Sequence, residues 1–225
     1  MKKIYNTILK MTAVIAVAFG LTACLEKLPG DYIPEEDAMK TLSDAEQTLT
    51  GIYTAYMSGA LYSGYLTLCP DIQTDLVYAV QGNTNQYGTH WLWDIRSTNS
   101  EVEAVYAGLY RVIGRCNFYL DQVEELRSNL TDDVEIQYLD YYTGEVYCAR
   151  ALAYSELIKC FCKAYDPATA EQELGVVLAD TYFGEAPKTR ASLYDSYQFV
   201  LEDLKKAEEL LDADNDWHNR AYFTN

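Results

Sequence analysis

The sequence has few histidines and few basic side chains for its length. Among 225 residues there are two histidines, His90 and His218, and 17 lysines and arginines stand against 34 acidic residues. Two histidines leave little room for a histidine-rich metal site. With a formal net charge of −17, the chain cannot neutralise a phosphate backbone, and an anionic membrane surface repels it. We therefore exclude nucleic-acid binding, and we expect no metal ion and no other cofactor.

Motifs of several enzyme classes are missing as well. The chain has no Gly-x-Ser-x-Gly elbow, no Gly-x-x-x-x-Gly-Lys phosphate loop and no Cys-x-x-Cys redox pair. Acids alternate over residues 212–216 as in a calcium loop, but Trp217 and Phe223 occupy the positions that need glycine and glutamate. Carboxylates are too numerous for a glycoside-hydrolase pair to be excluded. We expect no enzymatic activity, and a glycoside hydrolase is the least favoured alternative.

The N-terminus is typical of an exported protein. Residues 1–23 combine a basic start with an apolar run that is too short to cross about 30 Å of hydrocarbon comfortably. The Leu-Thr-Ala-Cys sequence that ends at Cys24 resembles a bacterial lipobox, which implies that Cys24 is the lipid-carrying mature N-terminus. An ordinary secretory signal with a chance cysteine is the alternative. Residues 24–40 are polar and form a tether.

Apolar spacing and capping residues predict two helices in the first part of the remaining chain. The first begins at Ser43, where Ser43 and Glu46 form a capping box, and ends near Gly59. The second begins at Ser100 with a similar box and continues to about residue 127. Residues 60–98 between them show no sustained period and form a long irregular segment. A loop of this length inside a compact domain is usually functional.

Two further helices and one short strand are predicted after residue 130. Residues 131–133 cap a long third helix, which stops by Pro167 because proline disfavours helix in the preceding residue. Residues 175–178 are a candidate strand. Ser192 opens a fourth helix with Asp195 in its first turn. Its predicted buried face comprises Leu193, Tyr197, Val200, Leu201, Leu204, Ala207 and Leu211.

The cysteines after Cys24 are odd in number, so at least one is unpaired. They are Cys69, Cys116, Cys148, Cys160 and Cys162. Cys160 and Cys162 are two residues apart in a helical pattern and therefore face different sides. Buried, hydrophobic cysteines are the favoured interpretation.

The order of these pieces resembles the SusD/RagB family of outer-membrane lipoproteins. The matching segments follow the lipobox in order, at residues 44–56, 109–120, 144–154, 175–178 and 190–211. Residues 144–154 match the family's Gly-Glu-Ala-x-x-x-Arg-Ala-x-x-Tyr signature, with Val146 in place of alanine. Family members are usually about twice as long, so residues 41–225 resemble an incomplete N-terminal helical region.

The resemblance implies a mainly α fold with tetratricopeptide-like helix pairs. It also implies a non-catalytic lipoprotein at the cell surface, anchored in the outer membrane. Such a protein binds a glycan or another nutrient and acts as the lid of a SusC-like TonB-dependent transporter. A surface adhesin or assembly lipoprotein that binds protein is the alternative.

Candidate ligand-binding residues lie before the second helix, where the family often places aromatic ligand contacts. They are Trp91, Trp93, Asn99, Asp71 and Asp75. We expect one tryptophan to stack on a sugar, and Asn99 or Asp71 to bind a hydroxyl group. Alternatively, the tryptophans wedge the loop onto the helices. If the segment is extended, Trp91 and Trp93 point to opposite sides, so that one is buried and one is free.

Three residues of the signature are given structural roles: Glu145, Arg150 and Tyr154. The five donors of an arginine suit a buried carboxylate or the carbonyl groups at a helix end. A structural ion pair or cap is therefore favoured over ligand contact for Arg150.

Overall fold

The computed structural model describes residues 37–211 except 75, 79 and 186. Cys24, Asp75 and the acidic segment 212–216 lie outside the described residues. The helices are α2 (Leu42–Tyr56), α3 (Tyr65–Ile72), α4 (Gly88–Trp91), α5 (Ser100–Asn129), α6 (Asp133–Phe161) and α7 (Leu193–Leu210). The described part of the chain contains no β-strand, so its fold is mainly α-helical.

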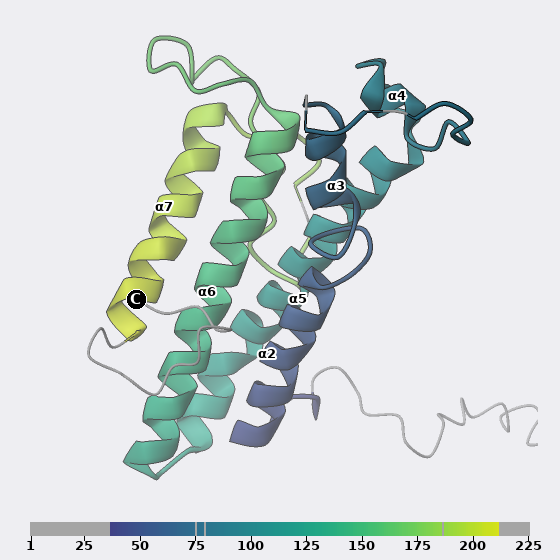
Figure 1. The fold of residues 1–225 in the computed structure, drawn as a ribbon. Coiled ribbons are helices and arrows are strands. Elements are labelled where there is room, and N and C mark those ends of the chain that lie inside the picture. The colour runs from purple at the N-terminus through teal and green to yellow at the C-terminus, as the bar shows by residue number, and fades with distance from the viewer. Residues whose placement is uncertain (1–36, 75, 79, 186, 212–225) are drawn as a thin grey trace, which may run out of the picture. The chain divides into compact units, whose positions relative to one another are not determined.

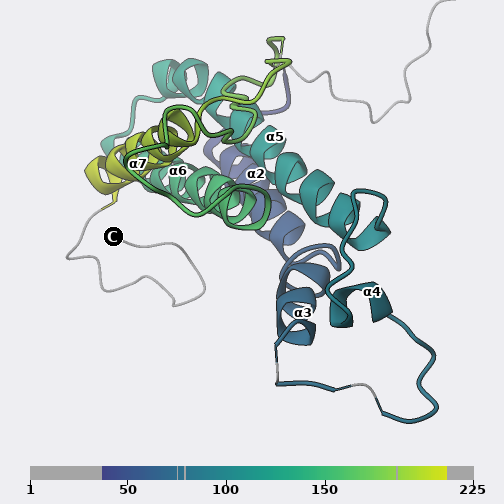
Figure 2. The ribbon, with the colours of Figure 1, turned by 90° about the horizontal axis from the view of Figure 1, so that it is seen from above.

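The long helices lie side by side, as Figure 1 shows, with α6 between α5 and α7 and with α2 packed on α5 and α6. Their facing sides form the hydrophobic core, which includes Leu49 and Ile52 of α2, Leu109 and Ile113 of α5, and Leu157 of α6. The short helices α3 and α4 lie at one end of this bundle, where α3 contacts α5. Figure 2 shows that the segment between α3 and α4 projects away from the long helices. Every helix in residues 37–211 is too short or too polar to cross a membrane.

The start of α2 differs from the sequence prediction by two residues. The capping residue is Thr41 instead of Ser43: its hydroxyl accepts a hydrogen bond from the Asp44 backbone at 3.2 Å. The Asp44 carboxylate accepts one in return from the backbone of Thr41 at 2.8 Å. Thr41–Asp44 therefore has the spacing of a capping box, with aspartate in place of glutamate. The helix ends at Tyr56, before Gly59.

The starts of α6 and α7 agree with the prediction in both position and capping residue. The start of α5 agrees in position but not in its capping. Asp132 caps α6 through a 2.8 Å hydrogen bond from Val134, and Ser192 caps α7 through a 2.9 Å bond from Asp195. The capping residue of α5 is Asn99, whose side chain makes no capping bond, so the predicted box at Ser100 is wrong.

The buried face of α7 is narrower than predicted. Leu193, Val200 and Ala207 are buried, but Leu201 and Leu204 remain 46 % and 43 % exposed. Asp203 lies on the buried face, where the prediction placed only hydrophobic residues. The prediction failed here because the partner of this carboxylate, described below, comes from another helix.

A close approach joins the C-terminal end of α7 to α6. A Cβ atom on Gly144 of α6 would lie 2.8 Å from Cγ of Leu211. A side chain at position 144 would force the Leu211 side chain to shift, because that distance is shorter than real Cβ contacts. The glycine of the family-like signature therefore has a packing role.

The predicted strand at residues 175–178 does not form. Gly175 donates to the Ala191 carbonyl at 2.8 Å, and Ala191 donates to the Val176 carbonyl at 2.8 Å. These bonds surround one isolated antiparallel bridge between Leu174 and Ser192. The segment therefore pairs with the residues that precede α7 but is too short to make a ladder.

Candidate ligand-binding surface

The segment between α3 and α5 is distinguished by the absence of charge. Residues 76–93 contain no aspartate, glutamate, lysine or arginine, although charged residues make up 23 % of the chain. Large hydrophobic side chains along it are exposed: Leu76, Tyr78, Val80, Trp91, Leu92 and Trp93. An exposed apolar patch of this kind usually marks an interaction site. We call residues 76–93 the uncharged loop.

Both tryptophans of the uncharged loop are exposed, so the expectation of one buried ring is wrong. Trp91 ends α4 and is 45 % exposed, and Trp93 is 70 % exposed. The backbone between them is not extended, because Trp93 adopts a left-handed conformation with φ of 59°. Tyr87 at the start of α4 also has a positive φ, of 60°. Bulky residues rarely adopt this conformation, and such strained positions cluster at ligand sites.

Asn99 braces the end of this segment. Its side-chain oxygen accepts a 2.7 Å hydrogen bond from the Arg96 backbone, and its amide nitrogen donates to the Thr89 hydroxyl at 2.9 Å. The amide therefore connects the start of α5 to α4. The structure thus brings Asn99 to the same region as the two tryptophans, with its amide already bound to protein groups.

Asp71 lies apart from these residues, near the end of α3. Its side chain is exposed, and its carbonyl accepts a 2.8 Å bond from the Thr74 hydroxyl. A cleft of about 540 Å³ runs between α3, α5 and the C-terminal end of α6. The described candidates Trp91, Trp93, Asn99 and Asp71 do not line this cleft.

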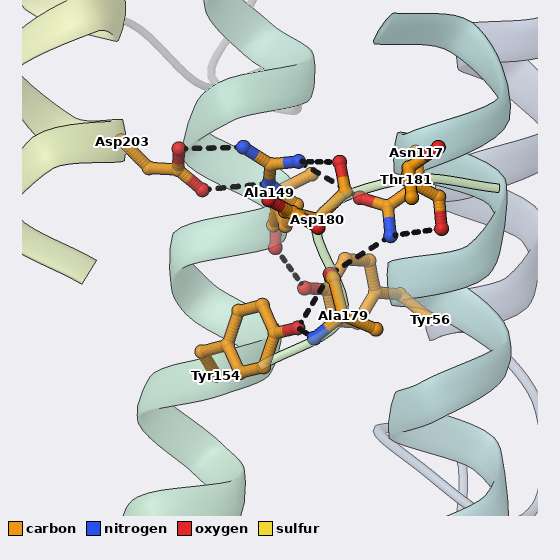
Figure 3. Close-up of polar contacts among 9 residues, drawn as sticks. Tyr56, Asn117, Ala149, Tyr154, Ala179, Asp180, Thr181 and Asp203 are labelled. Atoms are coloured by element: carbon orange, nitrogen blue, oxygen red, sulfur yellow. Dashed lines mark hydrogen bonds and ion pairs between the residues drawn. The ribbon is translucent and has the colours of Figure 1, made fainter. Parts of the chain in front are cut away.

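A buried arginine joins three of the long helices. Arg150 of α6 binds both carboxylate oxygens of Asp203 on α7, at 2.7 and 2.8 Å, and Oδ1 of Asn117 on α5 at 2.8 Å (Figure 3). Both side chains of the ion pair are at least 95 % buried. Burial lowers the pKa of the Arg150 guanidinium, but the hydrogen bond to Asp203 and the charge of that carboxylate outweigh it, so the pKa is raised. One side chain thus connects three helices.

The segment that follows α6 is attached to the same place. The Tyr154 hydroxyl donates to the Ala179 carbonyl at 2.7 Å and accepts from the Ala179 backbone at 2.8 Å. Asn117 donates to the same carbonyl at 2.9 Å. Figure 3 shows Tyr154 and Asn117 approaching Ala179 from α6 and α5. Arg150 and Tyr154 therefore contact protein groups and not the exposed surface.

Glu145 is a second buried charged residue of the signature. Its carboxylate accepts a short hydrogen bond from the Tyr53 hydroxyl of α2. Burial raises the pKa of Glu145 to about 7, and the Tyr53 bond lowers it only in part. The carboxylate therefore takes up a proton within the physiological pH range.

The buried role of Asp203 and the exposure of Cys160 were not predicted from the sequence. Asp203 lies three residues after Val200 and four residues before Ala207, which are both on the predicted apolar face of the fourth helix. An acidic residue at that spacing was the signal that could have identified a buried carboxylate. Cys160 is exposed rather than buried, and all five described cysteines are free. Residues 37–211 contain no cluster of three or more side chains suited to a metal ion.

Comparison with known proteins places the chain in a family. The model of the SusD-like family described as "Starch-binding associating with outer membrane" matches residues 31–224. A protein from Bacteroides vulgatus ATCC 8482 named for sugar binding is 26 % identical, with a TM-score of 0.68 over 83 % of this chain and 40 % of its own. No curated protein matches the chain.

Two more distant structures share the fold. A SusD homologue from Bacteroides thetaiotaomicron VPI-5482 is 20 % identical, with a TM-score of 0.68 over 84 % of this chain and 35 % of that one. A SusD-like carbohydrate-binding protein from B. vulgatus ATCC 8482 is 18 % identical, with a TM-score of 0.66 over 83 % and 39 %. The chain thus matches 35–40 % of the length of these three structures. Because the family model covers most of its length, the chain belongs to the SusD-like family.

Proposed function

We propose that the chain binds a carbohydrate at the cell surface and contributes to the lid of a SusC-like TonB-dependent transporter in the outer membrane. The observation that carries the proposal is the exposure of Trp91 and Trp93 on a loop without charge. An aromatic ring offers a flat apolar face to a sugar. Asparagine, glutamine and threonine side chains of the same loop can donate to and accept from hydroxyl groups.

The family description supports the proposed ligand class and location, because it names starch binding and association with the outer membrane. The relatives named for sugar or carbohydrate binding point to the same ligand class. A protein-binding adhesin remains the second candidate, since exposed Leu76, Val80 and Leu92 suit a protein partner as well as a sugar.

Replacing Trp93 with alanine is expected to weaken glycan binding about tenfold, which corresponds to about 1.4 kcal/mol of lost contact. A glycan array probed with the unaltered chain would first identify a ligand, and isothermal titration would then compare the variants. Trp91→Ala should have a similar but smaller effect because Trp91 is less exposed. Phe183→Ala removes a ring that is 54 % exposed on another loop, and should leave the affinity unchanged. Unchanged affinity in both tryptophan variants would contradict the site.

Cys24 is proposed as the site of lipid attachment. Labelled palmitate should enter the unaltered protein and not Cys24→Ala, and the variant should leave the membrane fraction. Two or more acyl chains anchor a protein stably, so loss of the modified cysteine removes the anchor. Equal labelling of the variant would exclude the lipid site.

The proposed transporter partner is tested by purification of the unaltered protein from a detergent extract, which should recover a TonB-dependent barrel. Recovery of a different partner would favour the adhesin.

A further inference from the structure

The cleft between α3, α5 and α6 has the dimensions of a small-molecule site. Its volume of about 540 Å³ lies within the range of roughly 300–1,000 Å³ typical of ligand pockets. Helices supply most of its wall: Leu66 and Pro70 come from α3, Val102 and Val105 from α5, and Phe161 from α6. The wall is therefore largely apolar, and packed helices hold most of it.

One polar side chain in this wall has an unmet hydrogen bond. His90 of α4 lines the cleft and is 2 % exposed. Its Nδ1 is buried and has no hydrogen-bond partner among the described residues. Buried polar atoms are nearly always paired in native proteins, so an unpaired one suggests a missing partner. A ligand hydroxyl group that reaches the imidazole would supply that partner.

The charges around the cleft disfavour an anionic ligand and leave one carboxylate able to accept a hydrogen bond. The Arg96 guanidinium is already bound by Asp94, at 3.0 and 2.7 Å, and Lys159 forms an ion pair with Glu156. Glu101 also lines the cleft, and within the described part of the chain its carboxylate accepts a single bond, from the neighbouring Ser100 hydroxyl at 3.2 Å. A neutral hydroxyl group can donate to this carboxylate, whereas an anion would be repelled by it.

We propose that this cleft binds a small neutral aromatic alcohol, with the ring between the walls of α3 and α5 and the hydroxyl group toward His90 and Glu101. An oligosaccharide fits less well, because its hydroxyl groups would face Leu66, Val102 and Val105 without partners. The cleft is separate from the two exposed rings, since Trp91 and Trp93 do not line it, although His90 of the uncharged loop does.

The proposal is tested with 2-naphthol as the probe and the whole chain as the protein. Titration followed by naphthol fluorescence should show saturable binding of one molecule per chain. His90→Phe keeps a planar ring but removes both nitrogens, and should weaken binding about tenfold without lowering the melting temperature. Val102→Trp should fill the cleft and abolish binding. Val134→Trp, at a position of α6 that is 57 % exposed and does not line the cleft, is the matched control and should bind normally.

Chemical protection gives a readout that does not depend on the variants folding. Cys160 is exposed and lines the cleft, whereas Cys148 lies elsewhere on α6. Bound 2-naphthol should slow the reaction of N-ethylmaleimide with Cys160 but not with Cys148, as measured by peptide mass spectrometry. Absence of saturable binding, or unprotected Cys160, would overturn the proposal. Weaker naphthol binding in Trp93→Ala would overturn it as well, because the probe would then occupy the glycan surface. Glycan binding in His90→Phe tests the proposed function separately.

Discussion

Replacing Arg150 with alanine is expected to lower the free energy of unfolding by about 3–5 kcal/mol. The change leaves the Asp203 carboxylate buried without its cation, and it removes the bond to Asn117. A buried charge that loses its partner is far more costly than the ion pair itself is stabilising. Urea denaturation followed by circular dichroism at pH 7 measures the loss.

Two further variants show whether this loss has the stated cause. The double variant Arg150→Met with Asp203→Leu should recover much of the stability, because apolar residues can replace a buried ion pair with little loss. Arg127→Ala breaks the partly exposed pair with Asp140 and should cost only about 0–1 kcal/mol. If Arg150→Ala is no more destabilising than Arg127→Ala, the role given to the buried pair is incorrect.

Replacing Glu145 with glutamine is expected to remove a fall in stability between about pH 4.5 and pH 7. The folded pKa of Glu145 is about 7, above the ordinary value of 4.5, so the folded chain holds the proton more tightly than the unfolded chain. Stability from this group is full below pH 4.5 and is lost as the pH rises through 7. The loss is on the order of 3–4 kcal/mol, since one pKa unit corresponds to about 1.4 kcal/mol.

The measurement is the melting temperature of the unaltered chain and of Glu145→Gln at four values from pH 5 to pH 8. Their difference should be small at pH 5 and should reach its maximum above pH 7, with the variant more stable. Tyr53→Phe provides the matched test: it removes the donor that lowers the pKa, so the fall should extend to higher pH. Parallel curves for Glu145→Gln and the unaltered chain would show that Glu145 does not titrate in this range.

Most of the helical architecture could be predicted because its determinants are local. Asp132 and Ser192 cap their helices within three residues, and the apolar period of each helix is visible in its own sequence. Helix α3 was missed because Pro70 lies inside it, and proline removes a backbone donor. Packing against α5 outweighs that cost, and a sequence pattern does not contain this information.

The candidate site could be located from sequence but not described. The tryptophans mark the region, whereas the left-handed backbone at Trp93 and the exposure of both rings are not visible in the sequence. The burial of Asp203 depends on an arginine that is 53 residues away in the chain. The cleft is formed by four helices and the loop that precedes α5, so no single segment contains its pattern. A single sequence does not show which distant segments come into contact, and the site depends on such contacts.

The absence of charge in residues 76–93 has a consequence for ionic strength. The rest of the chain carries the net charge of −17, whose field extends about 8 Å into solution at physiological salt. A neutral sugar that binds this loop releases no counterions, so its affinity does not change with salt. A sulfated or uronic-acid polymer meets the surrounding negative field and is repelled most strongly in dilute medium. As the proposed glycan site, the loop would therefore select uncharged polymers by a long-range effect, before any ring or hydroxyl contact is made.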